Sequence, residues 1–221
     1  MGLLDRFRSQ PAWKHPDPGV RLAAVDALPI DDQDLLAAVA AEDADARVRR
    51  AAVGKLMQPA ALAGVAAGDA DERVRDAARG MLRDLACGAF EGTSDADSLA
   101  ALDALQDARE LAAVAKDAPS EAIARAALDR LTDPRGVTGV ARQAQQVAIR
   151  LAALERVTDP AELLVVALKS EHKDAGLAAL ERITDRAALE AIGARARVKS
   201  VARKARAMVR ALDGAAAAAA E

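Results

Sequence analysis

Aromatic side chains are almost absent from this sequence, which contains two Phe, one Trp and no Tyr among 221 residues. Strands favour aromatic and β-branched residues, whereas roughly a quarter of this chain is alanine, the strongest helix former. The composition therefore argues against a sheet core and predicts closely packed helices. Because 52% of the residues are hydrophobic, the chain can bury a sizeable core, and extensive disorder is excluded.

Cysteine and histidine are also scarce. Cys87 alone cannot form an internal disulfide or a multi-cysteine zinc site, which is typical of a reducing compartment. His15 and His172 leave few routes to imidazole catalysis, and no P-loop, dinucleotide fingerprint or nucleophile elbow is present, so we expect no enzyme, no metal and no cofactor. No apolar run approaches the roughly 18 residues of a membrane span, and the first ten residues lack the apolar stretch of a signal peptide. We expect a cytoplasmic protein without a membrane partner.

A short repeat recurs through the sequence at a nearly constant interval. Its clearest marks are the equally spaced strings that begin at Leu105, Leu131, Val157 and Ile183, each followed by a polar residue and Asp. Four residues before this apolar position, and before the corresponding ones in the other units, the chain always has alanine: Ala24, Ala52, Ala78, Ala101, Ala127, Ala153, Ala179 and Ala205. Since alanine fills only about a quarter of the chain, eight in register indicate a site where neighbouring helices come closest.

Each repeat contains the pattern of two short helices. The second carries apolar residues at helical spacing, as in Ile123, Ala127 and Leu131, and the first carries an apolar pair three residues apart. Asp133 and Asp159 precede prolines, so the Asp is placed to N-cap the next helix and the Pro to occupy its first position. Leu4 and Phe7 fit the first helix of the first unit. The pattern predicts an all-α solenoid, a right-handed α-α superhelix of about eight helical hairpins whose second helices line the concave face.

Three segments in the first half carry a family resemblance. The sequence from Asp17 to Arg21, and those from Asp45 to Arg49 and Asp71 to Arg75, resemble the Asp-x-x-Val-Arg signature of HEAT repeats, especially the short HEAT-like kind. The opening around Trp13 is similar to that of bacterial proteins of unknown function with HEAT-like repeats. This resemblance implies interaction scaffolding. It also implies that each Asp caps the second helix and that each Arg pairs with an Asp of an adjacent unit, forming a ladder.

Two stretches depart from the repeat. Between residues 85 and 98 the repeat interval shortens and two glycines intrude, so we expect an irregular unit in which Phe90 either fills a core gap or forms a docking loop. Residues 213–221 form an alanine-rich tail, which we expect to be a linker, a frayed extension of the last helix or an arbitrary boundary of the sequence, and the chain is expected to be part of something longer. The solenoid is therefore expected to span residues 1–212.

Charge is concentrated near the end of the repeats. Residues 186–212 contain eight Lys and Arg against Glu190 alone. This basic end is either a capping helix kept soluble by charge or a surface for an anionic partner. Acidic and basic columns also run through the repeat, and we interpret them as exposed ion pairs between units, with a charge stripe that reads a partner as the alternative. The candidate binding residues for an anionic partner are Arg197, Lys199, Arg203, Lys204, Arg206 and Arg210.

The sequence favours a non-enzymatic protein-binding scaffold. Its concave face and basic C-terminal repeat are expected to dock an acidic protein or another copy of the chain. The alternative is a nucleic-acid-binding protein, with a role in DNA repair as one form of it, because some HEAT-like proteins are DNA glycosylases. Trp13 lies at one end, however, and aromatic platforms for bases are otherwise missing.

Overall fold

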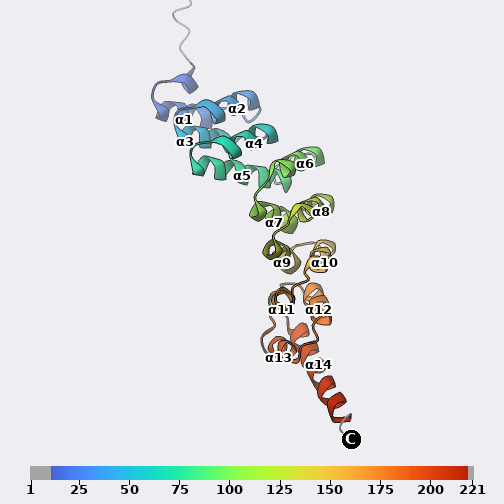
Figure 1. The fold of residues 1–221 in the computed structure, drawn as a ribbon. Coiled ribbons are helices and arrows are strands. Elements are labelled where there is room, and N and C mark those ends of the chain that lie inside the picture. The colour runs from blue at the N-terminus through green and yellow to red at the C-terminus, as the bar shows by residue number, and fades with distance from the viewer. Residues whose placement is uncertain (1–10, 219–221) are drawn as a thin grey trace, which may run out of the picture. The chain divides into compact units, whose positions relative to one another are not determined.

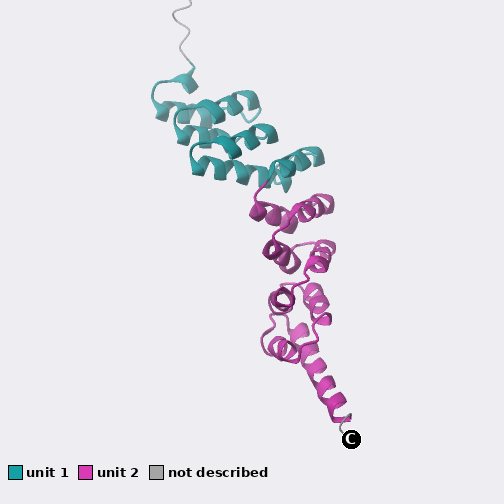
Figure 2. Cartoon of the chain, viewed as in Figure 1, with its two compact units in different colours: residues 1–105 teal, residues 106–221 magenta. Residues whose placement is uncertain are grey.

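The computed structural model describes residues 11–218. In this range it contains 14 α-helices, a short 3-10 helix η2 (Ala12–Lys14) and no strand, which confirms the all-α fold class (Figure 1). The chain divides into two compact units, residues 1–105 and residues 106–221 (Figure 2). That residues 1–212 form one continuous solenoid stays a prediction. Leu4 and Phe7 lie outside the described residues.

Unit 1 stacks short helices in two layers. Helices α2 and α3 form one hairpin and α4 and α5 the next, while α1 packs beside α3, α3 beside α5, and α2 beside α4. Neither layer could bury its apolar stripe alone, because isolated helices of this length are marginal in water. The helices of unit 1 are α1 (Pro18–Ala27), α2 (Gln33–Glu42), α3 (Ala46–Val53), α4 (Pro59–Gly68), α5 (Glu72–Ala86) and α6 (Asp95–Ala104).

Unit 2 repeats the same arrangement through four hairpins. The first helices, α7, α9, α11 and α13, pack on one another in order, as do the second helices, α8, α10, α12 and α14. Each unit is thus a helical solenoid in which a hairpin contacts its neighbours. The helices of unit 2 are α7 (Ala108–Asp117), α8 (Glu121–Arg130), α9 (Pro134–Gln143), α10 (Val147–Arg156), α11 (Pro160–Lys169), α12 (Lys173–Glu181), α13 (Arg186–Arg195) and α14 (Lys199–Ala218).

Aspartate caps begin many of these helices, as the sequence predicts. The Asp133 carboxylate accepts a hydrogen bond of 2.7 Å from the backbone N–H of Gly136, and Asp159 accepts one of 2.9 Å from Ala161. Pro134 and Pro160 are the first residues of α9 and α11, where a missing N–H costs nothing. Ser120 precedes α8 in the same way, but its side chain makes no cap hydrogen bond.

The alanine of each repeat is enclosed by the packed helices. Seven of the eight are completely buried, at 0% exposure, and the eighth, Ala24 on α1, is half-buried. Side chains no larger than a methyl group at this position let consecutive hairpins pack at short range. The alanine column is therefore a packing device that repeats along both units.

Backbone hydrogen bonds connect consecutive hairpins of unit 2. The N–H of Gln145 donates to the carbonyl of Lys116 at 2.9 Å, that of Glu171 to Arg142 at 3.1 Å, and that of Arg197 to Leu168 at 2.9 Å. The three donors are equally spaced along the chain, at the interval of the sequence repeat. These bonds join the turn of one hairpin to the first helix of the hairpin before it, so they fix the register of the stack.

The irregular stretch at residues 85–98 extends a helix and then turns sharply. Helix α5 continues for 15 residues to Ala86 and ends in a Schellman motif, in which the N–H of Ala89 donates to the carbonyl of Asp84. Gly88 adopts a φ of 64° there, a left-handed conformation that favours glycine. Helix α6 then packs against both α4 and α5, and the Ser98 hydroxyl donates to the carbonyl of Leu85 at 3.0 Å. Three mutually packed helices replace the hairpin pattern here.

We predict that enlarging one buried alanine destabilises the stack. Ala127→Leu on α8 places three additional carbons in a position with 0% exposure, which is expected to lower the free energy of unfolding by about 1–3 kcal/mol. Urea unfolding monitored by circular dichroism measures the change. Ala122→Leu, at an exposed position of the same helix, is the matched control and is expected to have little effect. Equal effects of the two variants would contradict the role given to the alanine column.

Candidate functional site

Arginine–aspartate pairs link neighbouring repeats, as the HEAT-like segments imply. Arg21 binds Asp43 of the next repeat with its Nε at 2.7 Å, and Arg49 binds Asp69 at the same distance. In unit 2, Arg150 binds Asp174 at 2.5 Å. Each of these arginines also donates to backbone carbonyls in the turn that precedes its own helix, so one guanidinium links that turn to the next repeat. The expected ladder is confirmed at Arg21 and Arg49 and recurs at Arg150. It is wrong at Arg75, whose guanidinium donates to the carbonyls of Asp69 and Ala70 and to no carboxylate of the described residues.

The pairs are shielded from water, and this shapes their electrostatics. The side chains of Arg49 and Asp69 are 12% and 5% exposed. Hydrogen bonds from Arg49 hold the pKa of Asp69 below its usual range, and those from Arg21 and Arg150 do the same for the pKa values of Asp43 and Asp174. The folded chain therefore releases these protons more readily than the unfolded chain does, so acidification removes stability as the pH falls below about 4.

Three further basic residues, Lys55, Arg156 and Arg182, cap the C-terminal ends of helices. We expected the basic column that contains them to form ion pairs with the acidic column of a neighbouring repeat. The Lys55 ammonium donates to the carbonyls of Val25 and Asp26 near the end of α1. The Arg156 guanidinium donates to the carbonyls of Leu128 and Leu131, and Arg182 to those of Leu154 and Val157. Carbonyls at a helix C-terminus lack partners within the helix and carry partial negative charge, so a cation satisfies both needs. These three basic residues therefore stabilise helix ends.

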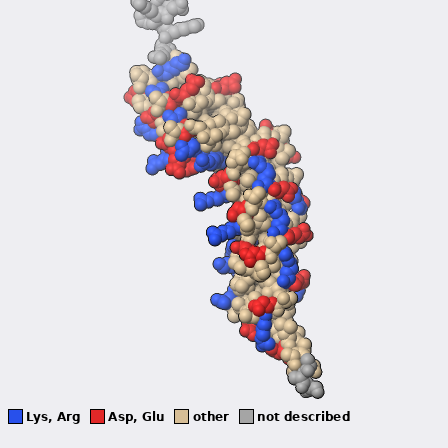
Figure 3. Space-filling model, viewed as in Figure 1, with Lys and Arg blue, Asp and Glu red and all other residues tan. Residues whose placement is uncertain are grey.

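Helix α14 carries five of the six candidate residues of the basic end, and Arg197 lies in the turn before it. Val201, Ala202 and Ala205 are buried against the preceding repeat. Lys199, Arg203, Arg206 and Arg210 are spaced by four, three and four residues, which places them on one face of the helix, and all four are exposed. We call these four residues the basic face of α14. On the face of the molecule drawn in Figure 3, basic and acidic side chains are interspersed along unit 2.

The structure divides the six candidate residues into two groups. Arg197 pairs with Glu171 at 2.9 Å, Lys204 with Glu181 at 2.6 Å, and Arg206 donates to the carbonyl of Gly193 at 2.6 Å. Lys199, Arg203 and Arg210 make no side-chain hydrogen bond or ion pair with any residue between 11 and 218. The candidate surface therefore narrows to these three cations, with Arg206 between them.

Arg206 also departs from the repeat pattern. The corresponding residue in α6, α8, α10 and α12 is a leucine that is at most 3% exposed: Leu102, Leu128, Leu154 and Leu180. An exposed arginine at this position replaces the apolar contact on which the pattern depends. Terminal repeats of solenoids carry a polar outer face for this reason. The apolar pattern of the second helices is therefore interrupted in α14, which continues to Ala218, beyond the length of the other second helices of unit 2.

The loop that contains Phe90 is the other predicted site. Phe90 is half-buried, and its carbonyl accepts hydrogen bonds from the N–H and hydroxyl of Thr93. Cys87 ends α5 and is also half-buried. Trp13, at the start of the described chain, is half-buried beneath the Lys14 ammonium, which lies 4.6 Å from the ring centroid. The described aromatic rings therefore belong to unit 1, whereas the basic face belongs to unit 2.

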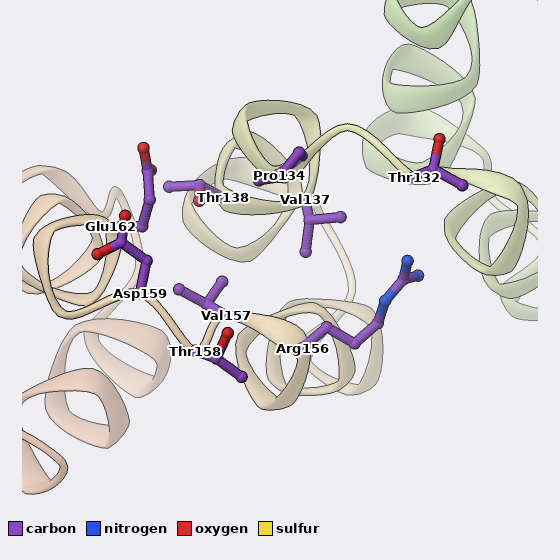
Figure 4. Close-up of a pocket in the computed structure, with 9 residues that line it drawn as sticks. All are labelled: Thr132, Pro134, Val137, Thr138, Arg156, Val157, Thr158, Asp159 and Glu162. Carbon is purple, nitrogen blue, oxygen red and sulfur yellow. The ribbon is translucent and has the colours of Figure 1, made fainter.

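A cavity of about 270 Å³ lies where α9, α10 and α11 meet (Figure 4). Glu162 and Asp159 lie on one side and Arg156 on the other, with Val137 and Val157 between them. The hydroxyl of Thr138, which also lines the cavity, is buried and has no hydrogen-bond partner. Sequence reasoning missed this cavity, because no motif distinguishes its residues from the other repeats. Its charges are divided across the space, so the lining favours no single class of ligand.

Comparisons with protein-family models, with curated proteins and with solved structures found no match to this chain. Within residues 11–218, none of the helices is both long enough and apolar enough to cross a lipid bilayer. The same range contains no group of three or more His, Cys, Asp or Glu side chains arranged to hold a metal ion.

We predict that the Arg49–Asp69 pair stabilises unit 1 in a pH-dependent way. Arg49→Met keeps the aliphatic stem but leaves the Asp69 carboxylate buried without its partner, which is expected to cost about 1–3 kcal/mol at pH 7. The loss is expected to shrink as the pH falls below about 4, because Asp69 is then protonated in the variant. Urea unfolding at several pH values measures both effects. Arg50→Met, at the exposed neighbouring position, is the control, and an equal loss in that variant would refute the assignment.

Proposed function

We propose that this chain is a non-enzymatic, cytoplasmic protein-binding scaffold whose basic α14 face docks an acidic partner protein. The contrast among the basic residues carries the proposal. Arginines and a lysine elsewhere in the chain are bound to carboxylates or helix carbonyls of neighbouring repeats, whereas Lys199, Arg203 and Arg210 are exposed and unbound within the described residues. Side chains that the fold leaves unused in one row are available to a partner.

The single sign of this face supports binding over mere solubility. A capping helix needs polar residues on its outer side, and residues of either sign meet that need. The basic face contains four cations over about three helical turns, or roughly 16 Å at 1.5 Å per residue, and no acidic residue interrupts it. Such a row attracts an anionic surface and steers its approach.

An acidic protein fits this surface better than a nucleic acid does. Proteins that hold single strands stack bases on aromatic rings, and residues 106–221 contain no Phe, Trp or Tyr. Carboxylates of a partner protein need only the cations themselves. The HEAT-like relationship also stays a proposal. It is supported by the Asp-x-x-Val-Arg segments, two of whose arginines, Arg21 and Arg49, link neighbouring repeats.

Charge reversal of the three unbound cations tests this function. Fluorescence anisotropy with a labelled polyglutamate peptide measures binding to the whole chain. The variant Lys199→Glu, Arg203→Glu, Arg210→Glu is expected to bind at least about tenfold more weakly, because it loses charge-assisted contacts and gains repulsion. Its unfolding midpoint is expected to stay close to that of the wild type.

The matched control makes the same change of net charge at scattered positions. Arg50, Arg73 and Lys173 are exposed and make no side-chain contact of this kind within the described residues, so Arg50→Glu, Arg73→Glu, Lys173→Glu should bind nearly as the wild type does. Equal weakening in both variants would contradict a localised site. Tighter binding of single-stranded or duplex DNA, with steep salt dependence, would favour the nucleic-acid alternative.

A further inference from the structure

A second basic surface lies in the first-helix layer of unit 2. A groove of about 310 Å³ runs between α7 and α9. Ala112 of α7 and Gly136 and Gly139 of α9 line it with the smallest side chains available. At Gly139, an added Cβ would meet no atom within 4 Å, so the missing side chain leaves open space instead of accommodating a neighbour. Because glycine in a helix interior costs about 1 kcal/mol relative to alanine, packing within the chain does not account for it.

Three cations border this groove. Arg109 and Lys116 belong to α7 and Arg135 to α9. Their side chains make no hydrogen bond or ion pair with any other residue of the described range. The carboxylate that shares the lining, Asp133, is occupied by the N–H of Gly136 at the start of α9. The groove therefore combines an apolar floor with three cations and one carboxylate in its lining, which leaves a net positive charge.

The later repeats do not keep this combination. One repeat onward, Gly136 and Gly139 are replaced by Glu162 and Val165. Two repeats beyond α7, Ala112 and Lys116 are replaced by Leu164 and Leu168 of α11. An acidic residue replaces one of the small residues, and large apolar residues replace the others. Neither the open floor nor the full set of cations is thus a consequence of the repeat itself.

We propose that the groove between α7 and α9 docks an acidic segment of a partner protein, one that also carries aliphatic side chains. Carboxylates of the segment pair with Arg109, Lys116 and Arg135, and its aliphatic side chains contact Ala112 and Gly139. The small side chains on the floor of the groove let the backbone of the segment approach α7 and α9 closely. This inference rests on the proposed scaffold function and gives unit 2 a second docking surface, in the layer of first helices instead of on α14.

Charge and shape complementarity favour this occupant. Nucleic acid would need stacking platforms, which the aromatic-free unit 2 lacks. A free phosphate would use the cations but would leave the apolar floor uncovered. A segment with both carboxylates and aliphatic groups matches both parts of the lining, as in grooves where apolar anchors give affinity and a polar rim gives specificity.

The experiment fills the groove without changing its charge. Gly139→Leu projects into the open space, and replacing glycine within a helix should raise the stability of α9, so a folding defect is not expected. Binding of a short labelled peptide of alternating glutamate and leucine to the full chain is measured by anisotropy, and amide shifts in NMR spectra locate the peptide. We expect at least about tenfold weaker binding for Gly139→Leu and for Arg109→Glu, Arg135→Glu. Shifts are expected at Ala112 and Gly139.

Two further variants separate this inference from the α14 proposal. Gly64→Leu makes the same substitution in α4 of unit 1, where the space is also open, and should bind the peptide as the wild type does. The α14 variant Lys199→Glu, Arg203→Glu, Arg210→Glu should retain the shifts at Ala112 and Gly139. Unchanged binding by Gly139→Leu would overturn the groove, and loss of those shifts in the α14 variant would place the peptide on α14 instead. If the chain forms dimers and Gly139→Leu abolishes them, the groove binds a second copy of this chain, and the proposal of a partner protein is wrong.

Discussion

Close approach of neighbouring helices at one alanine per repeat is the constraint on which the rest of the structure depends. With side chains no larger than a methyl group at these buried positions, the hairpins come near enough for backbone groups of one repeat to reach the next. That proximity allows the hydrogen bond from Gln145 to the carbonyl of Lys116, and it lets guanidinium groups span two repeats. Packing within each unit thus determines which polar contacts are possible.

Short helices create a particular need for cations. Every helix ends with carbonyls that lack partners, and a stack of helices about ten residues long has many such ends. Lys55, Arg156 and Arg182 satisfy some of them, while Arg21, Arg49 and Arg150 pair with carboxylates of the next repeat. Basic residues are therefore structural parts of this solenoid. Arg50, Arg73 and Lys173 are unbound but scattered, whereas the unbound cations that lie together, on α14 and beside the α7–α9 groove, are the ones we assign to partners.

The sequence predicted the parts of this fold that follow from periodicity. The alanine column and the arginine–aspartate links could be identified because each recurs at a fixed position, and Asp133 and Asp159 cap their helices as their place before proline suggests. Lys55, Arg156 and Arg182 were misinterpreted as members of ion pairs, because the backbone carbonyls that accept from them carry no signature in the sequence. At the candidate site, Arg206 looked like its basic neighbours, and only its contact with Gly193 distinguished it. The groove at Gly139 was missed because it depends on side chains that are absent.

The central claim is that the basic residues divide into two functional sets, and a charge scan tests it most directly. Each basic residue is replaced in turn by glutamine, and every variant is measured for its free energy of unfolding and for binding of acidic peptides. The account predicts that Arg49, Arg150 and Arg182 affect stability alone, whereas Lys199, Arg203 and Arg135 affect binding alone. If the same residues governed both quantities, or if the unbound cations affected neither, the division would be wrong.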